Sequence, residues 1–232
     1  MAEHTVKAYE EELRALDTRL VAMGELALAQ VRGAVTAIAA HDLVQAQAIV
    51  DRDAGLDHME AETEQLIVRL IALRQPVAQD LRRALSALKI AGNLERIGDL
   101  AKNIAKRTLV AGVADPDGLA HGSIARMGEL VADRLAQVLT AQRSQDIEGA
   151  EDVWRRDAEI DQQYDSLFRE LLTYMMADAR MITPCAHLLF VAKNLERIGD
   201  HATNIAEVVH YQITGDPMPG TGRPKWDALE ER

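Results

Sequence analysis

Apolar side chains recur along most of this chain at spacings of three and four residues, the period of an amphipathic helix. The first run extends from about Val6 to Ala40 and ends at His41 and Asp42. Asp42 suits the N-cap of a following helix, because its short carboxylate can accept hydrogen bonds from the first backbone N–H groups. The apolar positions of this first run are Leu13, Leu16, Leu20, Met23, Ala27, Ala34 and Ile38.

Six segments with this pattern are predicted, in two groups of three. Gln75-Pro76 marks a tight connection inside the first group, since proline favours a helix start and restricts the residue before it. Gly112 and the stretch 115–118, Asp-Pro-Asp-Gly, form the linker between the groups. Long helices with short connections run antiparallel, so each group is predicted to form a three-helix bundle. The predicted helices cover residues 6–40, 42–74, 77–110, 119–143, 146–178 and 181–214.

The two groups are copies of each other. Residues 23–26, Met-Gly-Glu-Leu, return 104 positions later at 127–130, and the same offset relates Asp42 to Asp146. Residues 93–99, Asn-Leu-Glu-Arg-Ile-Gly-Asp, return 101 positions later. Blocks in register over three helices indicate a duplication. The sequence therefore predicts an all-α chain of two tandem antiparallel three-helix bundles, residues 1–113 and 114–214, with a flexible Gly/Pro-rich tail at 215–232.

Each copy of the seven-residue motif carries two features that weaken an isolated helix. Carboxylates four residues apart lie on one face and repel each other by roughly a few tenths of a kcal/mol. A glycine in mid-helix costs about 1 kcal/mol relative to alanine. A bound cation and close helix packing would together explain both. The residues are Glu95, Asp99 and Gly98 in the first copy and Glu196, Asp200 and Gly199 in the second.

Further acids are expected at the level of these pairs. Counting outward from the two hairpin turns places Asp53 and Asp57 opposite the first pair, and Asp157 and Asp161 opposite the second. Four carboxylates in each repeat then form a candidate metal site. The alternative is a solvated acidic face that pairs with neighbouring bases such as Arg96, in ion pairs worth about 0–1 kcal/mol.

The two copies favour the metal site over the ion pairs. Lys102 becomes Thr203 and Lys106 becomes Glu207 in the second copy, whereas the acids of the motif are retained. A structural ion pair would retain its cation, and a metal site would retain its acids.

The ligand chemistry limits which metal and which function fit. Oxygen ligands, with Asn103 and Asn204 as candidate additions one turn further on, suit hard or borderline ions. The predicted ions are divalent or trivalent, and the choice among Fe, Mn, Mg, Zn and Ca stays open. A ferritin-like di-iron centre needs two Glu-x-x-His pairs, and only Glu207 with His210 fits. No catalytic residue and no enzyme activity are predicted. The alternatives are a structural helical adaptor without functional metal and, as the weaker one, a ferritin-like metalloenzyme.

Charge, cysteine content and hydropathy indicate which partners and which cellular compartment fit the chain. A net charge of −11 argues against nucleic acid as a partner. The single cysteine, Cys185, excludes an internal disulfide and fits a reducing cytosol. The N-terminus lacks the pattern of a signal peptide, and we expect no apolar run of the roughly 18–20 residues that span a bilayer. We therefore expect a soluble cytoplasmic protein.

The doubled motif resembles a known family. Two tandem copies of Leu-Glu-Arg-Ile-Gly-Asp-x-x-x-Asn-Ile-Ala, each in the last helix of a three-helix repeat, look like the PhoU family of bacterial phosphate-signalling regulators, over about residues 5–214. The resemblance implies a non-enzymatic negative regulator that joins the phosphate ABC transporter to the phosphate-sensor histidine kinase. It also implies metal ions at the two acidic motifs, a homodimer, and a cytoplasmic location, peripheral to the inner membrane through these partners.

Overall fold

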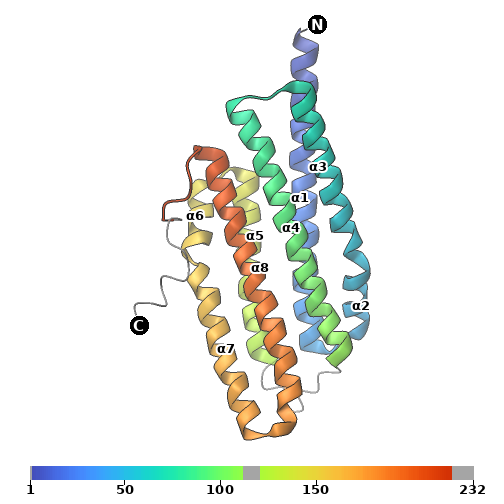
Figure 1. Ribbon diagram of the computed structural model, residues 1–232, viewed down its shortest axis with the longest axis vertical. Coiled ribbons are helices and arrows are strands. Elements are labelled where there is room, and N and C mark those ends of the chain that lie inside the picture. The colour runs from blue at the N-terminus through green and yellow to red at the C-terminus, as the bar shows by residue number, and fades with distance from the viewer. Residues whose placement is uncertain (1, 112–120, 221–232) are drawn as a thin grey trace.

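The computed structural model describes residues 2–111 and 121–220, which are almost entirely helical and contain no strand (Figure 1). All six predicted helical segments are helical, two of them with a break, and the predicted linker at 112–118 lies outside the described residues. In chain order the elements are α1 (Ala2–Ala40), α2 (Leu43–Arg52), α3 (Ala54–Arg74), α4 (Ala78–Ala111), α5 (His121–Ser144), α6 (Ile147–Arg155), α7 (Asp157–Ala177), the 3₁₀ turn η1 (Ala179–Met181) and α8 (Ile182–Thr214).

The second helix of each repeat is broken, where the sequence predicted one continuous helix over 42–74 and over 146–178. The first break falls at Asp53, where the Leu56 N–H bonds to the Asp53 carbonyl three residues back, at 2.9 Å. The second falls at Arg156, whose carbonyl accepts from the Glu159 N–H at 3.1 Å. These tightened turns interrupt the helical ladder. Both predictions of a single helix were wrong at this point.

The helix starts follow the predicted chemistry. The Asp42 carboxylate accepts a hydrogen bond from the Gln45 N–H at 2.9 Å, and Asp146 accepts one from the Gly149 N–H at 3.1 Å. Gln75 adopts a left-handed conformation, with φ of 50°, and ends α3 directly before the proline of the connection. The predicted N-cap at Asp42 is therefore confirmed, and its equivalent Asp146 caps α6 in the same way.

Four of the long helices form the centre of the molecule. Helix α4 lies along α8 and α1 along α5, while α1 also packs on α4 and α5 on α8 (Figure 1). The α2–α3 segment covers α1 and α4, and α6–α7 covers α5 and α8. Among the described residues, the buried apolar side chains of both repeats form one continuous cluster. The division into two domains, 1–113 and 114–214, stays a prediction.

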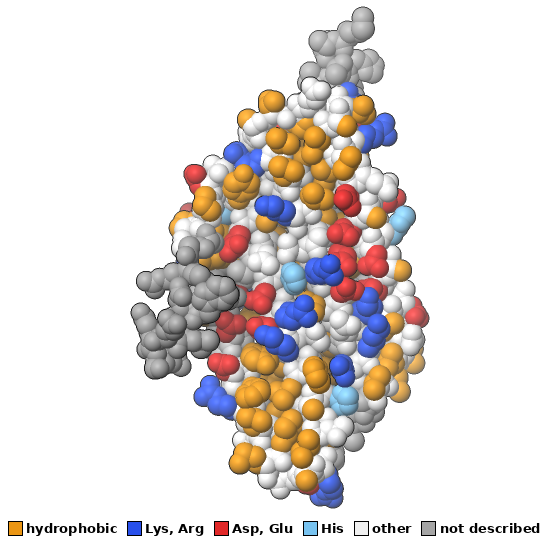
Figure 2. Space-filling view, in the orientation of Figure 1, with side chains coloured by type: hydrophobic (Ala, Val, Ile, Leu, Met, Phe, Trp, Pro, Cys, Tyr) orange, Lys and Arg blue, Asp and Glu red, His pale blue; other side chains and the backbone are white. Residues whose placement is uncertain are grey.

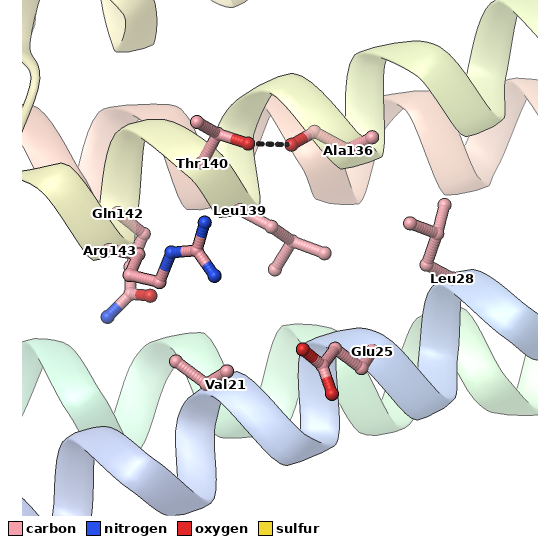
Figure 3. A pocket seen from close by; sticks show the side chains of 8 residues that line it. All are labelled: Val21, Glu25, Leu28, Ala136, Leu139, Thr140, Gln142 and Arg143. Atoms are coloured by element: carbon pink, nitrogen blue, oxygen red, sulfur yellow. Dashed lines mark hydrogen bonds between the residues drawn. The ribbon is translucent and has the colours of Figure 1, made fainter.

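The repeated Met-Gly-Glu-Leu block marks the close approach of α1 and α5. A Cβ on Gly24 would lie 2.6 Å from Leu139, and a Cβ on Gly128 would lie 2.5 Å from Val35. Because these four residues are equivalent pairs under the offset of 104, the two repeats face each other about an approximate two-fold axis. Figure 3 shows Leu139 projecting toward α1, beside a small pocket of about 170 Å³.

Helix α1 corrects one expectation from the sequence. Residues Glu10–Ala40 are long and apolar enough to cross a membrane, with a mean hydropathy of 1.3 over their most apolar 18 residues. Half of that window is buried inside the protein, and Leu16, Met23 and Ala27 are fully buried. The central helix of a bundle has the same composition as a membrane span, so this feature is weak support for membrane insertion.

Part of the predicted tail contacts the bundle. Of residues 215–232, the structure describes 215–220. Gly215 ends α8 with φ of 86°. Met218 is only 3% exposed and lines a pocket of about 410 Å³ with Leu85, Val208 and Tyr211. The first residues after α8 are thus packed against α4 and α8.

Candidate metal centre

The first acidic cluster lies where the break between α2 and α3 meets α4. Carboxylate oxygens of Asp53, Asp57 and Asp99 all lie within 4.8 Å of one another. Gly98 allows this approach, because a Cβ there would overlap the buried Leu56 side chain of α3. Close helix packing at the motif glycine, predicted from the sequence, is confirmed.

Glu95 belongs to the same acidic environment. Its side chain is only 14% exposed. Burial raises the pKa of Glu95, and the negative charges of Asp99, Glu60 and Asp57 raise it further. The positive charge of Arg96, whose Nε lies 3.4 Å from the Glu95 carboxylate, opposes this rise. Glu60 is an acid that the sequence analysis missed, although it stands three residues after Asp57 and so on the same face of α3.

The ammonium of Lys102 sits among these carboxylates. Its Nζ donates hydrogen bonds to Asp53 Oδ2 and to Asp99 Oδ1, the latter at 2.5 Å. The lysine side chain is 20% exposed. Burial alone would lower the pKa of Lys102, but the hydrogen bonds to the two aspartates outweigh burial and raise it. The sequence analysis considered Lys102 only as a cation that the second repeat replaces with Thr203.

The donor set of this cluster fits a divalent cation. Asp53 is 5% exposed, and its Oδ1 is buried without a hydrogen-bond partner among the described residues. An orphaned buried carboxylate oxygen beside two further carboxylates matches the oxygen ligands of Mg²⁺, Mn²⁺ or Ca²⁺. Lys102 provides a competing positive charge at the same place.

The acids predicted for the second cluster lie on the equivalent elements, α7 and α8, and have different partners. Among the described residues, only Asp53, Asp57 and Asp99 of the first cluster offer ligand oxygens close enough together to share a cation, so the second cluster stays a prediction. Asp157 accepts a hydrogen bond from Thr203 Oγ1 at 2.9 Å. The Lys193 ammonium lies 2.8 Å from the Glu196 carboxylate, and its pKa is raised because this contact outweighs burial. Asp161 and Asp200 are half-buried on the same two helices. A Cβ on the motif glycine, Gly199, would lie 2.7 Å from Ile160 of α7.

The two asparagines predicted as additional ligands are exposed on α4 and α8. Asn103 lines a surface pocket of about 400 Å³ with Lys106, Arg107 and Phe190, and the Arg107 guanidinium lies 4.5 Å from the centre of the Phe190 ring. A role of Asn103 and Asn204 in metal binding stays a prediction.

His201, beside the second motif, has a structural role. Its Nδ1 lies 2.9 Å from Asn93 Oδ1, so the contact joins α8 to α4. Burial, helped by the charge of Arg197, lowers the pKa of His201 and favours the neutral ring. The histidine thus connects the two repeats at the level of the motifs.

The face of the molecule that carries α4 and α8 is divided by charge. Figure 2 shows acidic side chains gathered over α3 and α4, basic side chains near the centre, and apolar side chains toward both ends. The apolar side chains near the α7–α8 hairpin include Phe168, Leu172, Met176 and Ile182, all at least 38% exposed.

Comparison with protein families finds the same family in each of the two repeats. The family model described as "PhoU domain" matches residues 20–108 and, separately, residues 124–209. The chain belongs to the PhoU family. The family predicted from the doubled motif is confirmed.

Relatives of this PhoU-family chain match it from end to end. It is 54% identical over 231 residues to the "Phosphate-specific transport system accessory protein PhoU homolog" of Caulobacter vibrioides, covering all of both chains. It is 34% identical to "Phosphate-specific transport system accessory protein PhoU" of Escherichia coli K12, over 97% of this chain and 93% of the relative.

Solved PhoU structures have the same fold. The crystal structure of PhoU from Pseudomonas aeruginosa matches with a TM-score of 0.86 at 36% identity, over 90% of this chain and 100% of that one. PhoU from Streptococcus pneumoniae, described as a phosphate transport system regulatory protein, matches with a TM-score of 0.83 at 30% identity, over 90% and 99%. The predicted all-α fold is confirmed.

Proposed function

We propose that this PhoU-family protein is a non-enzymatic negative regulator of phosphate uptake and of phosphate-regulon signalling. It acts in the cytoplasm as an adaptor between the phosphate ABC transporter and the phosphate-sensor histidine kinase. The observation that carries the proposal is the full-length match to the accessory protein of Caulobacter vibrioides, at 54% identity over the whole of both chains. A match of this extent spans both repeats, so it supports an equivalent role for the entire protein.

The proposal includes metal binding at the two acidic clusters. When bound, a divalent ion supplies positive charge that offsets the repulsion among carboxylates from neighbouring helices. The chain itself gathers three acids of the first cluster, because Gly98 lets α3 pack closely on α4, and Gly199 allows the same close approach of α7 to α8. The residues that would hold the ions are Asp53, Asp57, Glu95 and Asp99 in the first cluster and Asp157, Asp161, Glu196 and Asp200 in the second.

One observation favours an adaptor that needs no metal at the first cluster. The Lys102 ammonium already contacts two of its carboxylates. The ferritin-like alternative has no such support: Glu207 accepts a hydrogen bond from Trp154 at 3.1 Å, and His210 Nε2 lies 3.6 Å from a Glu151 oxygen. The single Glu-x-x-His pair is therefore engaged with α6.

Regulation is tested by deleting the gene and following a phosphate-regulon reporter in phosphate-rich medium. We expect derepression in the deletion strain and repression after complementation with the wild-type protein. Reporter activity that is the same with and without the gene would refute the assigned pathway. Co-purification with the transporter ATPase and with the cytoplasmic part of the kinase tests the adaptor role, and light scattering tests the homodimer.

Metal binding at the second cluster is tested with Glu196→Gln combined with Asp200→Asn, which conserves volume and removes two charges. Thermal melting is measured with EDTA and with added Mn²⁺. Saturation at 100 times the dissociation constant stabilises a protein by about 2.7 kcal/mol, so the wild type should show a clear rise in Tm that shrinks in the variant.

The matched control for this experiment is Glu129→Gln with Glu148→Gln, two exposed acids on α5 and α6. It removes the same charge and should keep the full metal response. Equal Mn²⁺-dependent shifts in the wild type and the Glu196/Asp200 variant would exclude the second cluster as a metal site.

A further inference from the structure

A basic pocket of about 400 Å³ lies between the second half of α4 and the first half of α8. Two of the six described side chains that line it carry a positive charge, two are amides, and none is an acid. In a chain with a net charge of −11, this pocket is a local reversal of sign that attracts anions. The lining residues are Asn103, Lys106, Arg107, Val110, Phe190 and Asn194.

The guanidinium of Arg107 is oriented by its neighbours. It lies 4.5 Å from the centre of the Phe190 ring, and its Nη1 atom lies 3.5 Å from Nδ1 of His187. Stacking on an aromatic ring covers the face of a guanidinium and leaves the N–H donors in its plane available. Because the side chain is already held, it loses less conformational entropy when an oxyanion accepts hydrogen bonds from it.

The duplication provides a second version of the same pocket. The pocket that Met218 lines is equivalent to the basic pocket, because four lining positions correspond under the offset of 101. Met218 is only 3% exposed, so the space between these helices holds a group comparable in size with a phosphoryl group. The corresponding pairs are Lys106 with Glu207, Arg107 with Val208, Val110 with Tyr211, and Phe190 with Lys89. The fold therefore does not require positive charge at these positions, and the basic lining calls for an explanation of its own.

We propose that the basic pocket binds a small tetrahedral dianion, orthophosphate or a phosphate monoester, which accepts hydrogen bonds from Arg107 and Lys106. A phosphate monoester carries a charge of about −1.5 to −2 at pH 7 and offers three strong acceptor oxygens. These properties match the two positive charges and the amide donors of the pocket better than a carboxylate, which has one charge and two oxygens. The site needs no metal ion, and it goes beyond the proposed function by adding a ligand.

Isothermal titration calorimetry of the full-length protein with orthophosphate, and separately with glycerol 3-phosphate, tests the proposal. Sodium chloride keeps the ionic strength constant, so that screening alone gives no signal. We expect one saturable site per chain. Arg107→Gln should weaken binding by at least about tenfold because it removes a charge-assisted, bidentate donor. Lys106→Gln should weaken it by about fivefold, since an exposed point charge contributes less. Tighter binding of orthophosphate would identify the free ion as the ligand, and tighter binding of glycerol 3-phosphate would identify an ester.

Lys89→Gln is the matched control for Lys106→Gln. Lys89 is an exposed lysine on the same helix and lines the equivalent pocket, so its loss changes the net charge equally. Phosphate affinity should change less than twofold. Arg107→Lys keeps the charge without the planar guanidinium, and its affinity should fall between those of the wild type and Arg107→Gln. Because Lys106 is exposed, Lys106→Gln keeps the test decisive if replacement of Arg107 disturbs the contact with Phe190.

The four asparagines of the chain locate the site independently of affinity. Asn103 and Asn194 line the basic pocket, whereas their equivalents Asn204 and Asn93 line neither of the two pockets. In ¹H–¹⁵N NMR spectra, phosphate should shift the side-chain amide signals of Asn103 and Asn194 and leave the other two in place.

Three results would overturn the inference. They are the absence of saturable binding at constant ionic strength, an affinity that both Lys106→Gln and Arg107→Gln leave within twofold of the wild type, and amide shifts confined to Asn93 and Asn204. An unchanged phosphate-regulon reporter in the deletion strain would instead refute the assigned pathway and leave this site standing.

Discussion

Gly98→Ala tests the close packing that gathers the first acidic cluster. A methyl group at this position of α4 would overlap Leu56, which is fully buried in α3. It would also lie 3.0 Å from the Oε1 atom of Gln30, a buried amide on α1. Side chains from two neighbouring helices therefore meet the added atom, and both of them are buried.

Two opposing effects set the size of the change. Alanine is favoured over glycine in a helix interior by about 0.5–1 kcal/mol. Overpacking a well-packed core typically costs about 1–3 kcal/mol. Because the overlap with Leu56 is severe, packing should win, and we expect a net destabilisation of about 1 kcal/mol. For a protein of this size that corresponds to a fall in Tm of about 2–4 °C.

Urea unfolding followed by circular dichroism, in EDTA, measures this change. Gly92→Ala is the matched control on the same helix, because a Cβ there meets only a Glu60 oxygen at 3.6 Å, an ordinary contact. Gly92→Ala should therefore stabilise the protein by about 0.5–1 kcal/mol. Leu56→Val should partly relieve the overlap, so the double variant Gly98→Ala/Leu56→Val should be more stable than additivity predicts. Gly98→Ala with stability equal to or above that of the wild type would refute the packing argument.

Three further results are expected. Burial raises the pKa of Glu95 above its unfolded value of about 4.3, so ionised Glu95 destabilises the metal-free protein. Glu95→Gln should therefore be more stable than the wild type at pH 7. Urea titrations should show this gain in stability disappear as the pH falls through the raised pKa toward about 4.3. The two 3.0 Å hydrogen bonds from Arg74 lower the pKa of Glu12. Glu12→Gln should therefore lower the free energy of unfolding by about 0.5–1 kcal/mol at pH 7, and this loss should vanish as the pH falls below about 4.3 through the lowered pKa. A loss of stability that does not depend on pH would contradict this. Because one core spans both repeats, separately expressed halves 1–113 and 114–214 should bind each other when mixed, and size-exclusion chromatography that finds only free halves would contradict the shared core.

Local patterns in the sequence determined the helices, the duplication and the family. Apolar periodicity and the capping residues Asp42 and Asp146 depend only on neighbours a few positions away, which is why the helix starts were predicted well. The hairpin turns fixed the axial level of Asp53, Asp57 and Asp99, and the structure brings these three together. Axial level follows from counting residues along two antiparallel helices.

Only the tertiary structure decided how the helices are rotated and which of them meet. The breaks at Asp53 and Arg156, and the packing of α4 on α8, arise from contacts between segments far apart in sequence, which periodicity cannot report. The same holds for Lys102: the sequence placed it near Asp99, but its contact with Asp53 required the rotation of α4 relative to α3. A side chain's place on its helix is a local property, whereas the partner it faces is set by the packing of the whole core.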